Sequence, residues 1–250
     1  TNDTLLSLER LKVELRLWKL LKKEVEIEEI SIRNATFDTR DFIDGVVVNG
    51  HLGELYLESH GVVFLPETAR INEFSVKNTD VSLTLENMED TDTTTTEPIY
   101  WKILLDEIDF ENVGFALKMP QDSLFVRTML PKTTLKNGVI DLKEASYYVK
   151  SFGIDNAELA YGPKEELFLQ QIGLQLDSIY YCGRDIRANV EEFVFKERSG
   201  LELVSTEGRI ASDSVLIQIP KFTMKTTASS LDLQTKIGWD VLEMKKAGVL

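Results

Sequence analysis

The chain has 250 residues, of which 43 % are hydrophobic, and its 28 basic and 42 acidic side chains give a net charge of −14. Such an acidic balance argues against binding to nucleic acid and against electrostatic docking on anionic lipid. The single cysteine, Cys182, excludes an internal disulfide, and no apolar run approaches the roughly 18 residues of a membrane-spanning helix.

The first segment predicts a strand, a short helix and a second strand. Residues 13–17 alternate apolar and charged side chains, which indicates a strand that ends near Leu17. Residues 18–23 are rich in leucine and lysine and predict one or two turns of a basic amphipathic helix, after which Val25 opens the next strand. Trp18 and Leu21 are interpreted as a lid over the end of the core, with a membrane or partner contact as the alternative.

A spaced apolar pattern anchored on an asparagine recurs along the chain. Apolar residues stand seven, four and two positions before the anchor and three positions after it, and the anchors are Asn34, Asn78, Asn112 and Asn156. Three later copies, at residues 169–181, 190–195 and 219–224, keep the spacing without the asparagine. Such recurrence is typical of a repeat protein.

The spacing predicts long, bulged and curved strands. Apolar residues two apart lie on one face of a strand, and each step of three shifts the alternation by one residue. A β-bulge or tight bend returns the apolar side chains to the same face, and asparagine tolerates the left-handed backbone that such a bend needs. A hairpin turn at each asparagine is the alternative, but no anchor precedes a glycine.

The repeats place a large set of apolar side chains on one face of the predicted sheet. We expect this face to be lined by Ile30, Ile32, Phe74, Val76, Leu83, Leu85, Ile108, Phe110, Phe115, Leu117, Phe152, Ile154, Leu159, Ile172, Leu174, Phe193, Phe195, Phe222 and Met224. Such a surface exceeds the ~300–600 Å² apolar patch of a soluble monomer. The sheet therefore closes on itself as a barrel or sandwich, or forms an open trough covered by lipid or a partner.

Turn signals divide the remaining sequence. Asn49–Gly50 and His60–Gly61 predict turns, and Asn137–Gly138 is the strongest hairpin signal. Residues 86–98 are acidic and threonine-rich and predict a flexible loop between repeats rather than a calcium loop or a domain boundary. After Gly162–Pro163 the shorter spacing predicts a plain antiparallel meander, and Val241–Leu250 a short helix or a disordered tail. The whole chain, residues 1–250, is predicted to be one domain.

The sequence lacks the motifs of common enzymes and cofactor sites. No nucleotide-binding, nucleophile-elbow or zinc-protease motif occurs, and His51 and His60 are too few for a metal site. Cys182 has no second cysteine near it and is interpreted as structural. We expect no cofactor, no metal and no enzymatic activity, although paired carboxylates of the glycosidase type remain an alternative.

The segment from Leu11 to Asn34 resembles the amino-terminal signature of the AsmA and TamB envelope proteins. In that signature an alternating strand is followed by a helical turn centred on a Leu-Leu pair, here Leu20–Leu21, and then by a strand with the spacing of Ile27, Ile30 and Ile32. The match is specific for about 30 residues, and the later repeats are compatible with it. Members of this family usually carry a membrane anchor and run much longer, so the chain is expected to be a segment.

The resemblance implies a mainly β fold: an elongated, curved antiparallel sheet of groove or taco shape, built of repeats, with a short amphipathic helix near the amino terminus. It implies a periplasmic location, with an inner-membrane anchor in the full-length protein. It also implies that phospholipid acyl chains pass along the groove in support of outer-membrane biogenesis. The alternatives are a scaffold or chaperone that presents a sheet edge for outer-membrane protein assembly, with an assembly barrel protein as partner, and a structural β-solenoid without a ligand.

Overall fold

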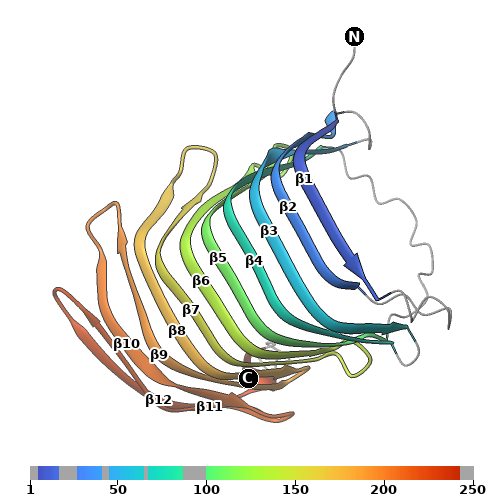
Figure 1. Cartoon of the computed structure of the whole chain (residues 1–250). Helices are drawn as coiled ribbons and strands as arrows, with labels where there is room; N and C mark the ends of the chain where they lie inside the picture. Colours follow the sequence, from blue (N-terminus) through green and yellow to red (C-terminus); the bar gives the residue numbers. More distant parts are fainter. Residues whose placement is uncertain (1–4, 17–26, 41–44, 65–66, 87–99, 243–250) are drawn as a thin grey trace.

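The computed structural model describes residues 5–16, 27–40, 45–64, 67–86 and 100–242, and 82 % of them lie in strands (Figure 1). Twelve strands form one sheet and follow one another in chain order. Their bounds are β1 (Leu6–Leu15), β2 (Ile27–Asp38), β3 (Val46–Phe64), β4 (Glu67–Leu85), β5 (Lys102–Met119), β6 (Leu124–Asp141), β7 (Ser146–Tyr161), β8 (Leu167–Cys182), β9 (Asp185–Glu197), β10 (Glu202–Ser212), β11 (Leu216–Thr226) and β12 (Ser230–Gly238). The mainly β class predicted from the alternation is confirmed.

The sheet is mixed rather than purely antiparallel. Ten of the neighbouring pairs are antiparallel, but β4 and β5 run parallel, with Phe74 beside Ile108 and Val76 beside Phe110. The prediction of an entirely antiparallel sheet is therefore wrong at this pair. A hairpin joins antiparallel strands with only a few residues, whereas residues 86–101 are long enough to return the chain to the other end of β4. The antiparallel meander predicted after Gly162–Pro163 is present in β8–β12.

The four anchor asparagines share one backbone conformation. Asn34, Asn78, Asn112 and Asn156 have φ angles of 49°, 50°, 54° and 55°, and each lies inside a strand that continues on both sides. The predicted left-handed backbone is thus confirmed at all four, and the alternative of a hairpin turn is wrong. In the parallel pair the two asparagines meet, because Asn112 Nδ2 donates a hydrogen bond to Asn78 Oδ1 at 3.2 Å. Figure 1 shows the long central strands bending together along the sheet.

Three predicted turns are wrong, because the glycines lie within strands. β3 continues through Gly50 and Gly61, and β6 continues through Gly138. A Cβ at Gly50 would stand 2.2 Å from the carbonyl oxygen of Asp80, and one at Gly138 would stand 3.3 Å from Leu105 Cβ. These two glycines therefore allow close approach of neighbouring strands rather than a reversal of the chain.

The sheet is a single layer that does not close. The outer edges of β1 and β12 have no strand partner in the described ranges, and extensive contacts join only neighbouring strands. The accessible surface is 16826 Å², compared with about 11,000 Å² for a compact protein of this mass. Neither a barrel nor a sandwich is formed by the described residues, so these two predicted alternatives are excluded for that part of the chain.

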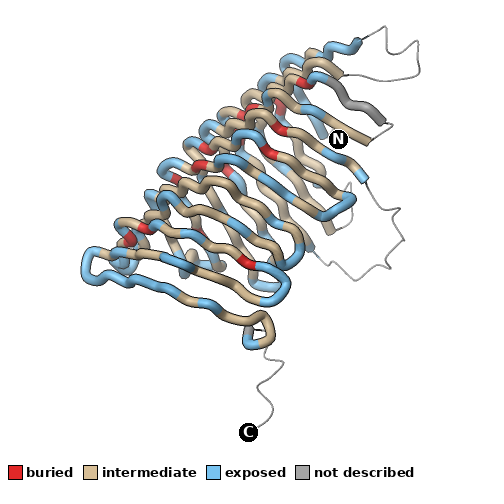
Figure 2. The backbone as a smooth tube through the Cα atoms, turned by 90° about the horizontal axis from the view of Figure 1, so that it is seen from below, coloured by how far each residue is buried: buried red, intermediate tan, exposed pale blue. Residues whose placement is uncertain are grey.

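Buried residues are few in the described ranges and are scattered over many strands. Figure 2 shows them as isolated positions on successive strands rather than as a central core. Ala35, Thr79 and Ala157, which directly follow three of the anchor asparagines, are only 3 %, 3 % and 2 % exposed. Small side chains fit this position because a bend brings the two arms of a strand together on its inner side.

Several predicted features lie outside the described residues. These are the helix at Trp18–Lys23, the flexible loop at 86–98 apart from its first residue, and most of the carboxyl-terminal tail. The helix within the described ranges is the single turn α2 (Trp239–Leu242), which overlaps the predicted tail helix by two residues.

Candidate functional site

One row of apolar side chains crosses the whole sheet. Directly paired residues of neighbouring strands point to the same face. The strand register connects one position on every strand into a row, here called the central row. Its members, from β1 to β12, are Val13, Ile30, Leu57, Phe74, Ile108, Leu135, Phe152, Leu176, Val190, Gly208, Phe222 and Leu233.

The one member without a side chain does not interrupt the central row. A Cβ placed on Gly208 would lie 2.5 Å from the ring of Phe222, so this ring covers the glycine. Elsewhere the row contains aliphatic or aromatic side chains, and Phe74 contacts Phe110 edge to face with ring centroids 6.2 Å apart. The central row is therefore a continuous apolar track across twelve strands.

A second apolar row runs beside the central row, two residues away from it on β1 to β8 and three residues away on β9. It contains Leu11, Ile32, Leu55, Val76, Phe110, Thr133, Ile154, Leu174 and Phe193, on β1 to β9. Phe195, another predicted lining residue, pairs with Leu203 and lies outside this row. Met224 pairs with Thr206 and Leu231 on the last three strands.

The other predicted lining residues lie beyond the bends. Leu83 pairs with Leu117, and Phe115 pairs with Val81 across the parallel strands. Leu85 lies opposite Val46, Ile172 opposite Ala157 and Leu159 opposite Leu169. Members on return strands, such as Leu55, Leu57, Leu135 and Leu176, were not among the predicted lining residues. These strands lack the asparagine, although the alternation of Leu55 and Leu57 was a visible signal.

Two threonines interrupt the apolar composition. Thr133, in the second row, is 7 % exposed, and Thr206, opposite Met224, is 2 % exposed. Their hydroxyl oxygens have no hydrogen-bond partner. A buried hydroxyl without a partner costs about 1–3 kcal/mol. Because these oxygens are covered by neighbouring side chains, they do not present a polar group to a ligand.

The opposite face is charged, and its best-ordered row alternates in sign. Arg33, Glu54, Lys77, Glu111, Lys132 and Asp155 are directly paired on β2 to β7 and form what we call the alternating row. Arg33 contacts Glu54 at 3.2 Å, and Lys77 contacts Glu111 at 3.4 Å. Opposite charges directly across from one another stabilise a sheet.

A parallel row on the same face consists only of acids. Glu14, Glu29, Glu58, Glu73 and Glu107 are directly paired on β1 to β5 and are called the glutamate row. Lysines lie at its two ends: Lys12 contacts Glu14 at 2.8 Å and Glu29 at 2.9 Å, and Lys136 contacts Glu107 at 2.9 Å. Hydrogen bonds to these carboxylates raise the pKa of both lysines above the ordinary value.

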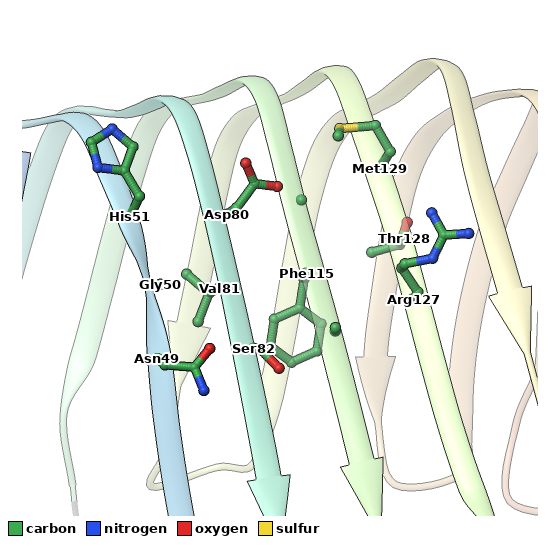
Figure 3. A pocket seen from close by; sticks show the side chains of 12 residues that line it. Asn49, Gly50, His51, Asp80, Val81, Ser82, Phe115, Arg127, Thr128 and Met129 are labelled. Carbon is green, nitrogen blue, oxygen red and sulfur yellow. The ribbon is translucent and has the colours of Figure 1, made fainter. Parts of the chain in front are cut away.

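The hollow drawn in Figure 3 lies over β3 to β6, and Gly114 is one of its lining residues. His51 and Asp80 are direct cross-strand partners at its edge, and a Cβ on Gly114 would stand 2.1 Å from Asp80 Oδ1. The carboxylate of Asp80 thus occupies the space over the glycine. His60, the other histidine, is exposed and contacts Asn72 through Nδ1.

The described part of the chain provides no metal centre. No group of three or more His, Cys, Asp or Glu side chains there is arranged to hold a metal ion. Among those same residues, no helix is long and apolar enough to cross a membrane. The apolar face, which the central row crosses from β1 to β12, is the strongest candidate for a functional site.

Comparison with known proteins adds no family assignment. No protein-family model matches the chain, and no curated protein matches it either.

Proposed function

We propose that the chain is a segment of a periplasmic, non-enzymatic protein that conducts phospholipid acyl chains passively along the apolar face of its sheet, in support of outer-membrane biogenesis. The observation that carries the proposal is the unbroken central row on a single-layer sheet. The amino-terminal resemblance to the AsmA and TamB proteins supports the location, the phospholipid class and the membrane anchor of the longer protein.

The size of the apolar face supports a lipid ligand. Twelve strands have eleven spacings (12 − 1); at about 4.8 Å each the central row is roughly 50 Å long. That length exceeds the ~30 Å hydrocarbon core of a bilayer, so acyl chains fit along the row end to end. Burial of each methylene contributes about 0.8 kcal/mol without directional contacts, which holds a chain and still lets it slide.

The bends support a trough in which the apolar face is the inner surface. Ala35 lies opposite Leu8 and Leu52, on the apolar face, and is nearly inaccessible. In a single layer, burial at a bend arises on the inner side, where the two arms of each strand converge. The proposed trough is elongated and built from the asparagine-anchored repeats, and lipid headgroups remain in water at its open side.

The test measures bound lipid and stability together. Phospholipid is extracted from protein purified without detergent, and thermal unfolding is followed for wild type, Phe110→Asp and Ile154→Asp. We expect phospholipid on the wild type and little on either variant, with melting temperatures near wild type, because a charge on the inner face blocks an acyl chain yet reaches water. Ser151→Asp, on the polar face of β7, is the matched control and should retain its lipid.

Two results would contradict the proposal. The first is a wild-type protein that carries no phospholipid. The second is collapse of both variants on heating while Ser151→Asp melts normally, which would indicate a closed core around these positions.

The second candidate function is a scaffold for outer-membrane protein assembly that presents a sheet edge to an incoming strand. The observation in its favour is the open outer edge of β1, where Leu6 and Leu11 are 57 % and 54 % exposed. Co-purification of an outer-membrane barrel protein, lost when β1 is altered and retained in Phe110→Asp, would favour this function.

A further inference from the structure

The outer edge of β1 is an open pairing surface within the described ranges. In the described part of the chain β1 pairs only with β2, so one side of its backbone has no strand partner. Leu11 and Val13 continue the second and central rows, and Leu6, Leu8, Leu11 and Val13 are 39–57 % exposed. Natural sheets protect such an edge with proline, a bulge or charged side chains; residues 6–15 contain no proline, and the register shift of β1 lies only at its end, between Glu14 and Leu15, so pairing specificity at this edge depends on its charges.

The charges at the middle of β1 lack a complement on this strand's own sheet. Arg10 lies directly opposite Arg33, and Arg33 already contacts Glu54 at 3.2 Å. Within the described ranges the Arg10 guanidinium makes no ion pair. Its neighbour Glu9 faces Asn34, whose side-chain amide contacts the glutamate. The outer edge of β1 therefore presents the carboxylate of Glu9 next to the guanidinium of Arg10, which has no ion-pair partner in the described ranges.

We infer that two copies of this chain associate through antiparallel pairing of β1 with β1, about a two-fold axis between Glu9 and Arg10. In this register Glu9 of one copy lies opposite Arg10 of the other, and the same pair forms a second time by symmetry. Leu8 lies opposite Leu11 and Leu6 opposite Val13, so both apolar faces stay on the same side of the joined sheet.

The shape of β1 fits this register. Its apolar residues change from alternation to a step of three between Leu8 and Leu11, and Asn34 on β2 has its left-handed backbone opposite this step. The two-fold axis passes through the middle of the step, so the bend of one copy coincides with the bend of the other. A head-to-tail pairing of β1 with β12 would instead extend as a filament, whereas the two-fold pairing closes as a dimer.

The first test measures the dissociation constant of the 250-residue protein by sedimentation over a concentration series. Arg10→Glu replaces two opposite-charge pairs with two like-charge pairs, so the dissociation constant should rise at least about tenfold. The double exchange Glu9→Arg with Arg10→Glu restores both pairs and should return it to within about threefold of wild type. Asp232→Arg, on the opposite edge strand β12, is the control and should leave it unchanged.

Misfolding does not confound this experiment. Glu at position 10 would face Arg33 within its own sheet, so Arg10→Glu should melt at or above the wild-type temperature. A monomeric wild type overturns the inference, as does a dimer that Arg10→Glu leaves intact or that Asp232→Arg dissociates.

The second test examines the register with cysteines, in a Cys182→Ser background. A mixture of Leu8→Cys and Leu11→Cys proteins should form disulfide-linked dimers on oxidation, because these positions are opposite one another. Leu8→Cys alone should not, since its two copies are three residues out of register. Equal cross-linking in both samples would overturn the proposed register.

Discussion

The alternating row and the glutamate row lie on the same face and cross the same strands, yet they follow opposite rules. Lys77 lies between Glu54 and Glu111 in the alternating row, whereas Glu73 lies between Glu58 and Glu107 in the glutamate row. Both residues lie on β4, four positions apart and on the same face of the sheet, so their surroundings can be compared directly. The difference shows that the sheet tolerates a run of like charges when the carboxylates are at least partly solvated and a cation lies at each end.

Breaking the alternating row should have the largest effect. Lys77→Glu removes attraction to Glu54 and Glu111 and replaces it with repulsion, which gives four acids in a row of six. With each cross-strand pair contributing up to about 1 kcal/mol, we expect the free energy of unfolding to fall by about 2 kcal/mol. Urea denaturation measures this change. An unchanged midpoint would mean that solvent screens the face so strongly that the order of charges has no importance.

Introducing alternation into the glutamate row should act in the opposite direction and less strongly. Glu73→Lys removes repulsion from Glu58 and Glu107 and adds attraction, but Glu107 already contacts Lys136 at 2.9 Å. We expect a gain of about 1 kcal/mol in the free energy of unfolding. Glu73→Gln, which removes the repulsion alone, should give about half of that gain. Destabilisation by Glu73→Lys would show that the acids have a bound counter-charge.

Salt should change the stability of variants in the two rows by different amounts. Raising sodium chloride shortens the Debye length from about 10 Å at 0.1 M to about 3 Å at 1 M, which weakens the glutamate repulsion. Over this range the free energy of unfolding of Lys77→Glu should therefore rise by a few tenths of a kcal/mol more than that of wild type. The free energy of unfolding of Glu73→Lys should rise less than that of wild type over the same range of salt concentration. Identical salt dependences for all three proteins would contradict an electrostatic origin.

Alkaline pH should give the smallest effect, through the two lysines that end the glutamate row. Their folded-state pKa values lie above the ordinary 10.5 because of Glu14, Glu29 and Glu107. A raised lysine pKa contributes stability that is fully present below 10.5 and is lost as pH rises through the folded-state value. Lys136→Met should remove part of this alkaline loss, measured as a shallower fall of melting temperature. An unchanged slope would exclude the lysine as a stabilising partner.

The strands and the left-handed backbone at the anchor asparagines could be predicted from the sequence because both depend on local properties. Alternation specifies which side chains share a face, and asparagine at φ near 50° is a local conformational preference, as at Asn34 and Asn156. The same preference explains the error at Asn137–Gly138. Asn137 has a φ of 53°, as a hairpin would require, but Leu105 on the neighbouring strand packs against Gly138 and the chain continues.

The parallel pair was not predicted because strand order depends on distant contacts. A signal was nevertheless present in the anchor spacing: 78 − 34 = 44, 112 − 78 = 34 and 156 − 112 = 44 residues. The longer intervals contain a return strand, β3 or β6, and the described residues of the shorter interval contain none. Only part of the candidate apolar face was predicted, because pairing with neighbouring strands decides which residues of the other strands join it. The asparagine-bearing strands were recognisable, whereas Leu135 and Leu176 join the central row only through pairing.

The parallel contact of β4 and β5 also divides the molecule in a particular way. Every other neighbouring pair is antiparallel, so the strands on either side form a four-stranded and an eight-stranded meander. No hairpin ties the two meanders, and they share a single backbone ladder from Thr68 beside Lys102 to Thr84 beside Lys118. A gene split between Leu85 and Lys102 would leave both meanders whole, so this seam is the natural place for fragment complementation.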